Sequence, residues 1–263
     1  MLTRRNLLTR SSIAAGAGVL AEQPPINFMG AAAAQDPARK DGGKPIQFYH
    51  DYRVLGLDLP QLPGAYKLNQ EAKEPLILGH LLFAIGKLRT RGTSPVTVGE
   101  LFCADAYYSF VARRFGADHC DAFDNDQDGY LEQAQLLIDL LKETNVDLHK
   151  TDVFEIPKEF RASIIINAGG LYHVADPLRS LEQSYAMCEQ YLIIQTVVSV
   201  AREDDDYFET PAPGWTWGSR FTYGFLRREI LKRGYRIVDE DRNVLTGNDR
   251  PEDRGSAYFL IAR

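Results

Sequence analysis

Two acidic residues follow two apolar segments at a spacing that suits nucleoside binding. Glu100 lies near the end of the apolar segment 96–101, and Asp124 ends the next apolar segment, 24 residues later. In a strand, turn, helix, strand unit, an acid about 20 residues beyond the first strand reaches the ribose of a bound nucleotide. Val111 and Phe115 lie at helical spacing between the two segments. We therefore expect this unit here, with Asp124 at a ribose.

The turn between strand and helix lacks glycine. Phe102, Ala104 and Ala106 stand where a dinucleotide-binding turn has its glycines. Glycine lets the backbone approach a pyrophosphate closely, and a side chain at these positions prevents that approach. The composition of the turn therefore disfavours NAD and FAD.

Further polar residues follow the next two expected strands. Asp152 and Val153 end an apolar and polar run, and Asn167 ends the apolar segment 162–167, shortly before Tyr172 and His173. Open α/β sheets bind ligands at the carboxyl ends of their strands. His173 is a candidate general base because an unperturbed imidazole has a pKa of about 6.5. An equal alternative is that His173 only orders its loop, while Tyr172 contacts a cofactor or donates to a substrate.

Together these motifs resemble the cofactor-binding half of class I S-adenosylmethionine-dependent methyltransferases, over roughly residues 96–200. The resemblance implies adenosylmethionine as cofactor and in-line methyl transfer. It does not define the acceptor, which we expect to be a small molecule or a nucleoside-like compound. The segment 171–173, Leu-Tyr-His, is similar to the transfer-RNA wobble-uridine modifying subgroup of these enzymes. The resemblance makes His173 and Tyr172 the catalytic candidates. The implied cofactor-binding residues are Glu100, Phe102, Ala104, Asp105, Ala106, Asp124, Asn125, Asp152, Val153 and Asn167.

The elements that must position these residues alternate as in an α/β protein. We predict a Rossmann-like three-layer sandwich with a mostly parallel seven-stranded sheet, a C-terminal antiparallel hairpin and an N-terminal helical cover. A helix is expected over 69–89, capped by Asn69. The hairpin is expected to join strands 235–239 and 256–262 through a long polar loop over 240–255.

The N-terminus carries features of an export signal. Arg4 and Arg5 precede a short apolar stretch and a run of alanines at 31–34, which together resemble a twin-arginine signal peptide with its cleavage site. We expect a signal over 1–34, a linker over 35–45, a cover segment and helix over 46–92, and the methyltransferase domain over 93–263. This organisation predicts a periplasmic or extracytoplasmic protein that uses the twin-arginine export machinery. A mis-called start codon would instead leave the protein cytoplasmic.

The net charge and the composition disfavour some classes of partner and ligand. The net charge is −6 and the pI is about 5.5, whereas a nucleic-acid-binding domain usually carries a concentrated basic stripe. The apolar stretch near the N-terminus is too short and too broken to span a bilayer. Three cysteines match no zinc-binding spacing, so we expect buried free thiols and no metal site. Nucleic acid is therefore an unfavoured partner.

Two other functions remain open. Asp124, Asp126, Asp128 and Gly129 match the start of a calcium loop, but Gln135 stands where the bidentate glutamate is needed. The glycine-poor turn would also suit a non-catalytic nucleoside-binding protein of the same fold. Methyl transfer remains the preferred interpretation because it accounts for more of the motifs.

Overall fold

The protein is described by a computed structural model for residues 46–263. The signal peptide predicted over 1–34 and the linker predicted over 35–45 lie outside the described residues, and both stay predictions.

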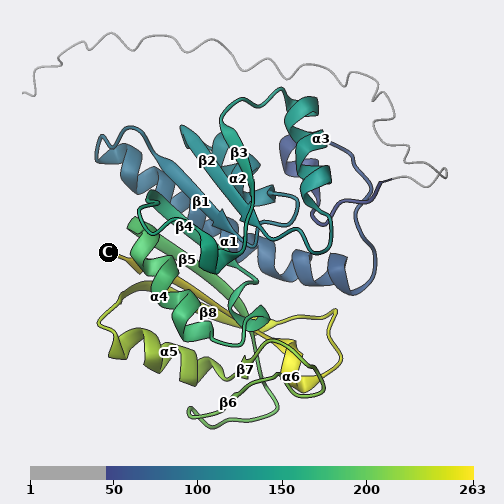
Figure 1. Cartoon of the computed structure of the whole chain (residues 1–263), viewed down its shortest axis with the longest axis vertical. Coiled ribbons are helices and arrows are strands. Elements are labelled where there is room, and N and C mark those ends of the chain that lie inside the picture. The colour runs from purple at the N-terminus through teal and green to yellow at the C-terminus, as the bar shows by residue number, and fades with distance from the viewer. Residues whose placement is uncertain (1–45) are drawn as a thin grey trace, which may run out of the picture. The chain divides into compact units, whose positions relative to one another are not determined.

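A mostly parallel sheet forms the centre of the structure (Figure 1). Its strands are β1 (Thr97–Leu101), β2 (His119–Asp124), β3 (Val146–Lys150), β4 (Ala162–Ala168), β5 (Cys188–Val198), β8 (Arg236–Val244) and β9 (Gly255–Ala262). They lie in the order β3-β2-β1-β4-β5-β9-β8. The first five are parallel, and β9 pairs antiparallel with both β5 and β8. Strands β6 (Phe208–Glu209) and β7 (Arg220–Phe221) form a separate small antiparallel pair.

Helices cover both faces of the sheet, which gives the predicted three layers (Figure 1). The α-helices are α1 (Ala65–Thr90), α2 (Tyr107–Arg114), α3 (Leu131–Leu141), α4 (Pro177–Met187), α5 (Tyr223–Lys232) and α6 (Pro251–Arg254). Three short 3₁₀ turns are η1 (Tyr52–Leu55), η2 (Val153–Glu155) and η3 (Leu171–His173). One half of the core joins α1, α2 and α3 to one face of the sheet, and the other joins α4 and α5 to the opposite face.

The strand sequences explain the layers. Ile164, Ile165 and Ile166 in β4 are fully buried, as are Leu192 and Ile193 in β5. Continuous apolar runs of this kind suit central parallel strands that are covered on both faces. The predicted fold class is therefore confirmed, with the strand order that brings the carboxyl ends of β1, β2, β3 and β4 to one edge.

Two predicted boundaries were wrong. Helix α1 begins at Ala65 after Gly64, so Asn69 is not its cap; the Asn69 side chain instead accepts from the backbone N–H of Gly247 and donates to Asn248. Strand β8 continues to Val244, well into the segment expected to be loop. Both differences arise from long-range contacts that a local pattern does not contain.

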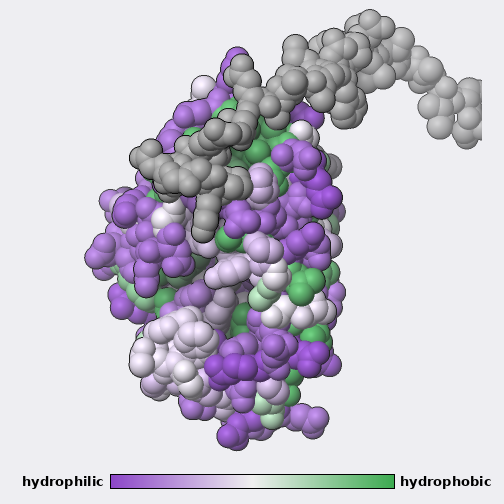
Figure 2. All heavy atoms as spheres, turned by 90° about the vertical axis from the view of Figure 1, so that its right-hand side faces the viewer, coloured by the Kyte–Doolittle hydropathy of each residue, from purple (hydrophilic) through white to green (hydrophobic). Residues whose placement is uncertain are grey.

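Among residues 46–263, no helix combines the length and hydropathy that crossing a bilayer requires. Hydrophilic residues predominate on the face drawn in Figure 2, and apolar residues occur there in small patches. The three cysteines are buried free thiols, as predicted.

Candidate nucleoside site at the strand ends

The turn after β1 has the backbone of a glycine-rich turn without its glycines. Phe102, Ala104 and Ala106 all adopt the left-handed conformation, with φ of 57°, 48° and 59°. Such angles are ordinary for glycine and cost other residues roughly 1–2 kcal/mol each. The N–H of Cys103 donates to the Phe123 carbonyl at 3.1 Å, which ties the turn to β2. The sequence therefore keeps this backbone shape despite its cost.

Asp124 lies directly behind this turn at the end of β2. One carboxylate oxygen accepts from the Ala104 N–H at 3.0 Å, and the other accepts from the Asp126 N–H at 2.7 Å. Burial raises the pKa of Asp124 despite these two hydrogen bonds. The carboxylate thus joins the turn, the second strand and the loop that follows it.

A small cavity lies at these strand ends. Its volume is about 20 Å³, close to the space needed by one water molecule. Five predicted cofactor-binding residues line it, and the structure adds three that the sequence interpretation missed. The full lining is Leu101, Phe102, Phe123, Asp124, Asn125, Thr151, Asp152 and Val153. A larger hollow of about 460 Å³, between η1 and α1, has none of these residues in its lining.

Two other predicted residues face the protein interior. The Glu100 carboxylate is buried and accepts from the backbone N–H and hydroxyl of Ser109, at 2.7 and 2.6 Å. The Asn167 amide is also buried, and it donates to the Ser184 hydroxyl of α4 at 3.0 Å. These side chains fix α2 and α4 to the strand ends, so they act as positioning residues. Neither of them lines the cavity.

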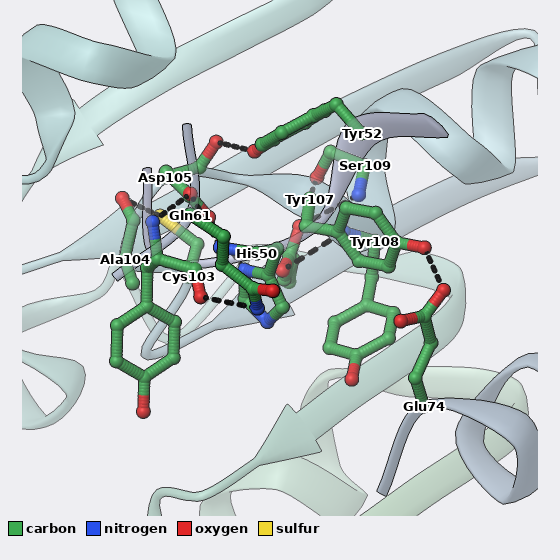
Figure 3. A network of polar contacts seen from close by, with 12 residues as sticks. His50, Tyr52, Gln61, Glu74, Cys103, Ala104, Asp105, Tyr107, Tyr108 and Ser109 are labelled. Atoms are coloured by element: carbon green, nitrogen blue, oxygen red, sulfur yellow. Dashed lines mark hydrogen bonds and ion pairs between the residues drawn. The ribbon is translucent and has the colours of Figure 1, made fainter. Parts of the chain in front are cut away.

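Asp105 is tied to the segment that precedes α1 (Figure 3). Its carboxylate is fully buried, lies 2.6 Å from His50 Nδ1, and accepts from the backbone N–H groups of Tyr49 and His50 at 2.8 and 3.0 Å. The Tyr52 hydroxyl donates to the Asp105 carbonyl at 2.9 Å. Residues 46–64, which we call the cover segment, are therefore held onto the turn. No local pattern indicates this contact, because its partners lie 55 positions apart in the sequence.

Aromatic rings gather beside the cover segment. Tyr49 contacts Tyr66 and Tyr130, with ring centroids 5.7 and 5.3 Å apart. Burial raises the pKa of Tyr49 well above its ordinary value, and the nearby Tyr172 contributes to the same shift. The ring contacts therefore link the cover segment to α1 and to the loop that follows β2.

The catalytic candidates lie together after β4. The His173 ring stacks on Trp217 at 5.3 Å, and the Arg220 guanidinium lies over the Tyr172 ring at 5.1 Å. Partial desolvation and the positive charges of Arg220 and Lys73 lower the pKa of His173. The ring is consequently neutral at pH 7 and is a weaker base than an unperturbed imidazole. Burial raises the pKa of Tyr172 to about 12, which keeps its hydroxyl protonated.

Two polar side chains of α1, those of Gln70 and Lys73, are buried. Neither the amide nitrogen nor the amide oxygen of Gln70 has a hydrogen bond among the described residues. Burial lowers the pKa of Lys73 to about 8. Such groups are costly in a protein interior.

The calcium hypothesis finds no support here. Asp126 accepts from the N–H of Leu131 at the start of α3 and from the Lys150 ammonium, at 3.0 and 3.1 Å. Asp124 is engaged by backbone amides, as described above. Within residues 46–263, the carboxylates of Asp124, Asp126 and Asp128 do not converge on a common point.

The residues around the small cavity have the chemical types needed to bind the adenosine part of adenosylmethionine. Carboxylates at Asp124 and Asp152 can accept from ribose and adenine, and Val153 and Phe123 supply apolar walls. The volume of about 20 Å³ is far below the 300 Å³ or more of ordinary ligand pockets. Occupation would therefore require Phe102 or the loops beside it to move.

Comparison with protein-family models and with curated proteins gives no match. Solved structures share the fold at low sequence identity. Magnesium protoporphyrin IX methyltransferase (ChlM) from Synechocystis PCC 6803, with bound SAM, has a TM-score of 0.56 at 13% identity, covering 81% of this chain and 89% of its own. The [4+2]-cyclase SpnF has a TM-score of 0.51 at 13% identity, covering 64% of this chain and 74% of its own. The chain thus has the Rossmann-like fold of class I methyltransferases, a fold that SpnF also uses.

Proposed function

We propose that the protein is an adenosylmethionine-dependent methyltransferase. The observation that carries the proposal is the turn after β1, where three residues that are not glycine hold left-handed angles directly beside Asp124. A sequence that retains a strained backbone in a particular shape indicates a functional constraint on that shape. That SAM is bound in a structure of the same fold supports this choice of cofactor.

The proposed roles follow from the geometry. Asp124 would hold the ribose, Asp152 and Val153 would flank the adenine, and the turn 102–106 would contact the remainder of the cofactor. Adenosylmethionine, when bound, supplies an electrophilic methyl group. The chain's own task is then to align a nucleophile with this group and to exclude water. The cover segment and the aromatic residues beside it are placed to exclude water.

We infer that the acceptor is a small molecule or a nucleoside-like compound. The loop that carries Trp215 and Trp217 packs beside Tyr172 and His173, where an acceptor would meet the methyl group. Aromatic side chains on loops commonly line small-molecule sites. The likeness to wobble-uridine modifying enzymes rests on Leu-Tyr-His at 171–173 followed by Asp176 and Pro177, and the negative net charge opposes RNA as acceptor.

Calorimetric titration of the protein with adenosylmethionine and with adenosylhomocysteine tests the proposed identity of the cofactor. We expect both to bind, and Asp124→Asn to weaken them about 10- to 100-fold, because a charged hydrogen-bond acceptor for the ribose is lost. Asp128→Asn is the matched control, since Asp128 is exposed on the same loop and does not line the cavity. Failure of the folded native chain to bind either compound would refute the proposal.

A second candidate is a non-catalytic nucleoside-binding protein. The observation that favours it is the closed cavity of about 20 Å³, whose wall includes the Phe102 side chain. Radiolabelled adenosylmethionine incubated with the protein and a metabolite extract separates the two functions. Label transferred to an acceptor supports the enzyme, whereas tight adenosylhomocysteine binding without transfer supports the binding protein.

A further inference from the structure

A cluster of histidine and aspartate side chains lies on β2 and β3, separate from the nucleoside cavity. Asp121 and Asp147 are directly opposite each other in the parallel register. Side chains alternate between the two faces along a strand. His119 and Asp121 of β2 therefore share one face with Asp147 and His149 of β3. Cys120 and Ala122 point to the other face, where they join the core.

The distances from His119 to the two carboxylates are those between neighbouring ligands of a metal ion. His119 Nε2 lies 3.4 Å from Asp147 Oδ2 and 3.5 Å from Asp121 Oδ2. These separations exceed an ordinary hydrogen bond of about 2.9 Å. Ligand atoms at about 2.0–2.1 Å from a tetrahedral Zn²⁺ lie roughly 3.3–3.5 Å from one another, by the geometry of a tetrahedron. One ligand atom from each of the three side chains lies within 4.8 Å of the other two.

His149 holds one of these ligands in place. Its Nε2 lies 2.8 Å from Asp121 Oδ1, whereas the contact of His119 is with the other carboxylate oxygen, Oδ2. Its ring stacks on the buried Phe123 ring at 4.6 Å, which fixes its orientation. Hydrogen bonds of this kind from a neighbouring side chain orient metal ligands in known sites. The cluster is thus preorganised from two adjacent strands.

The chemistry of the donors selects the ion. An imidazole with two carboxylates suits Zn²⁺ and similar divalent transition metals, whereas Ca²⁺ and Mg²⁺ prefer oxygen ligands alone. The side chains of His119, Asp121 and Asp147 are 35, 20 and 61% exposed, so an ion can reach them from solvent. The buried cysteines are not available as competing thiolate ligands.

We propose that His119, Asp121 and Asp147 bind one Zn²⁺, with His149 positioning Asp121 and water completing the coordination. The ion would join β2 to β3, the strand at the edge of the sheet. It would also neutralise two neighbouring carboxylates.

Titration of the untagged, metal-free full chain with ZnCl₂ tests the site, and CoCl₂ gives a spectroscopic readout. We expect one equivalent to bind, visible absorption bands of low-symmetry Co²⁺, and a rise in the melting temperature, because an ion that binds only the folded state stabilises it. Neither CaCl₂ nor MgCl₂ should compete at similar concentrations. The alternative is that the cluster consists of ion pairs only, which predicts no stoichiometric binding and overturns the proposal.

Substitutions locate the ion. His119→Gln and Asp147→Asn should each weaken Zn²⁺ binding by at least about 10-fold, and His149→Gln should weaken it about 10- to 100-fold. His80→Gln is the matched control, because His80 pairs with a single carboxylate, Asp239, at 3.3 Å. Zinc affinity that is unchanged in both His119→Gln and Asp147→Asn would place the ion elsewhere and refute the site. Circular dichroism of each variant confirms that it is folded.

Discussion

At the scale of single residues, the turn after β1 combines the backbone shape of a glycine-rich turn with residues that are not glycine. Ala104 has a φ of 48°, and its N–H donates to the Asp124 carboxylate at 3.0 Å. The hydrogen bond is made in this left-handed conformation, which the Cβ atom of Ala104 disfavours. The same conflict occurs at Ala106, which is fully buried. Ala104 and Ala106 are therefore residues strained by their left-handed backbone conformation at the centre of the proposed site.

Replacement of Ala104 by glycine should relieve this backbone strain. We expect Ala104→Gly to raise the free energy of unfolding by about 0.5–1 kcal/mol, because the relief of left-handed strain exceeds the added chain entropy of glycine. Ala112→Gly, in the right-handed helix α2, should lower it by about 1 kcal/mol or more. Urea denaturation of the two variants and the native chain measures both effects. Destabilisation by Ala104→Gly would mean that its methyl group contributes packing that outweighs the strain.

At the scale of elements, Glu100 joins β1 to the start of α2. The N-cap residue of α2 is Ala106, which has no side chain that can accept from the first helical amides. The Glu100 carboxylate accepts from the N–H of Ser109 at 2.7 Å and so performs the task of a cap from the neighbouring strand. Burial raises the pKa of Glu100 to about 8, against an ordinary value of 4.5. The contact between strand and helix is thus sensitive to pH.

The sign of this dependence follows from proton binding. Between pH 4.5 and 8 the folded state holds the Glu100 proton more tightly than the unfolded state, so stability falls as the pH rises through this window. The slope approaches about 1.4 kcal/mol per pH unit at most. Glu100→Gln should remove this component and flatten the profile between pH 6.5 and 8, while Glu159→Gln, at an exposed position, should not. Urea midpoints at several pH values measure the difference, and parallel profiles for native and Glu100→Gln chains would contradict it.

The helices and strands also show how much of the fold and of the candidate site the sequence predicts. The apolar runs of β4 and β5 and the acids at 100 and 124 predicted the sheet and the place of the cavity, because burial and strand ends leave local patterns. The start of α1 was misplaced because Asn69, a good capping residue, is used by Gly247 and Asn248, nearly 180 positions away. Glu100 and Asn167 stand at the predicted strand ends but face the interior. A sequence pattern gives their position along the chain, and tertiary packing decides the direction of their side chains.

At the scale of the whole molecule, a segment that lies outside the sheet is fixed to the turn beside the proposed site. The cover segment is fixed to the turn through Asp105, whose carboxylate meets His50 Nδ1 and two backbone amides (Figure 3). The cavity behind the turn holds about one water molecule. Entry of the proposed cofactor therefore requires a more open state, and we predict that the energy of the Asp105 contacts contributes to the equilibrium between the two states.

Loosening this contact should expose the cover segment selectively. His50→Gln removes one charged hydrogen bond to Asp105, which is worth about 1.5–3 kcal/mol, so local opening should become roughly 10- to 150-fold more frequent. Hydrogen exchange measured by mass spectrometry should then rise for peptides within 46–64 and stay unchanged for β4 and β5. Asp58→Asn, at an exposed position of the same segment, is the control and should leave exchange unaltered. If closure limits entry, adenosylhomocysteine should also associate faster with His50→Gln. Equal increases in hydrogen exchange across the cover segment and the central strands would show that the contact stabilises the whole fold and does not specifically hold the cover segment in place.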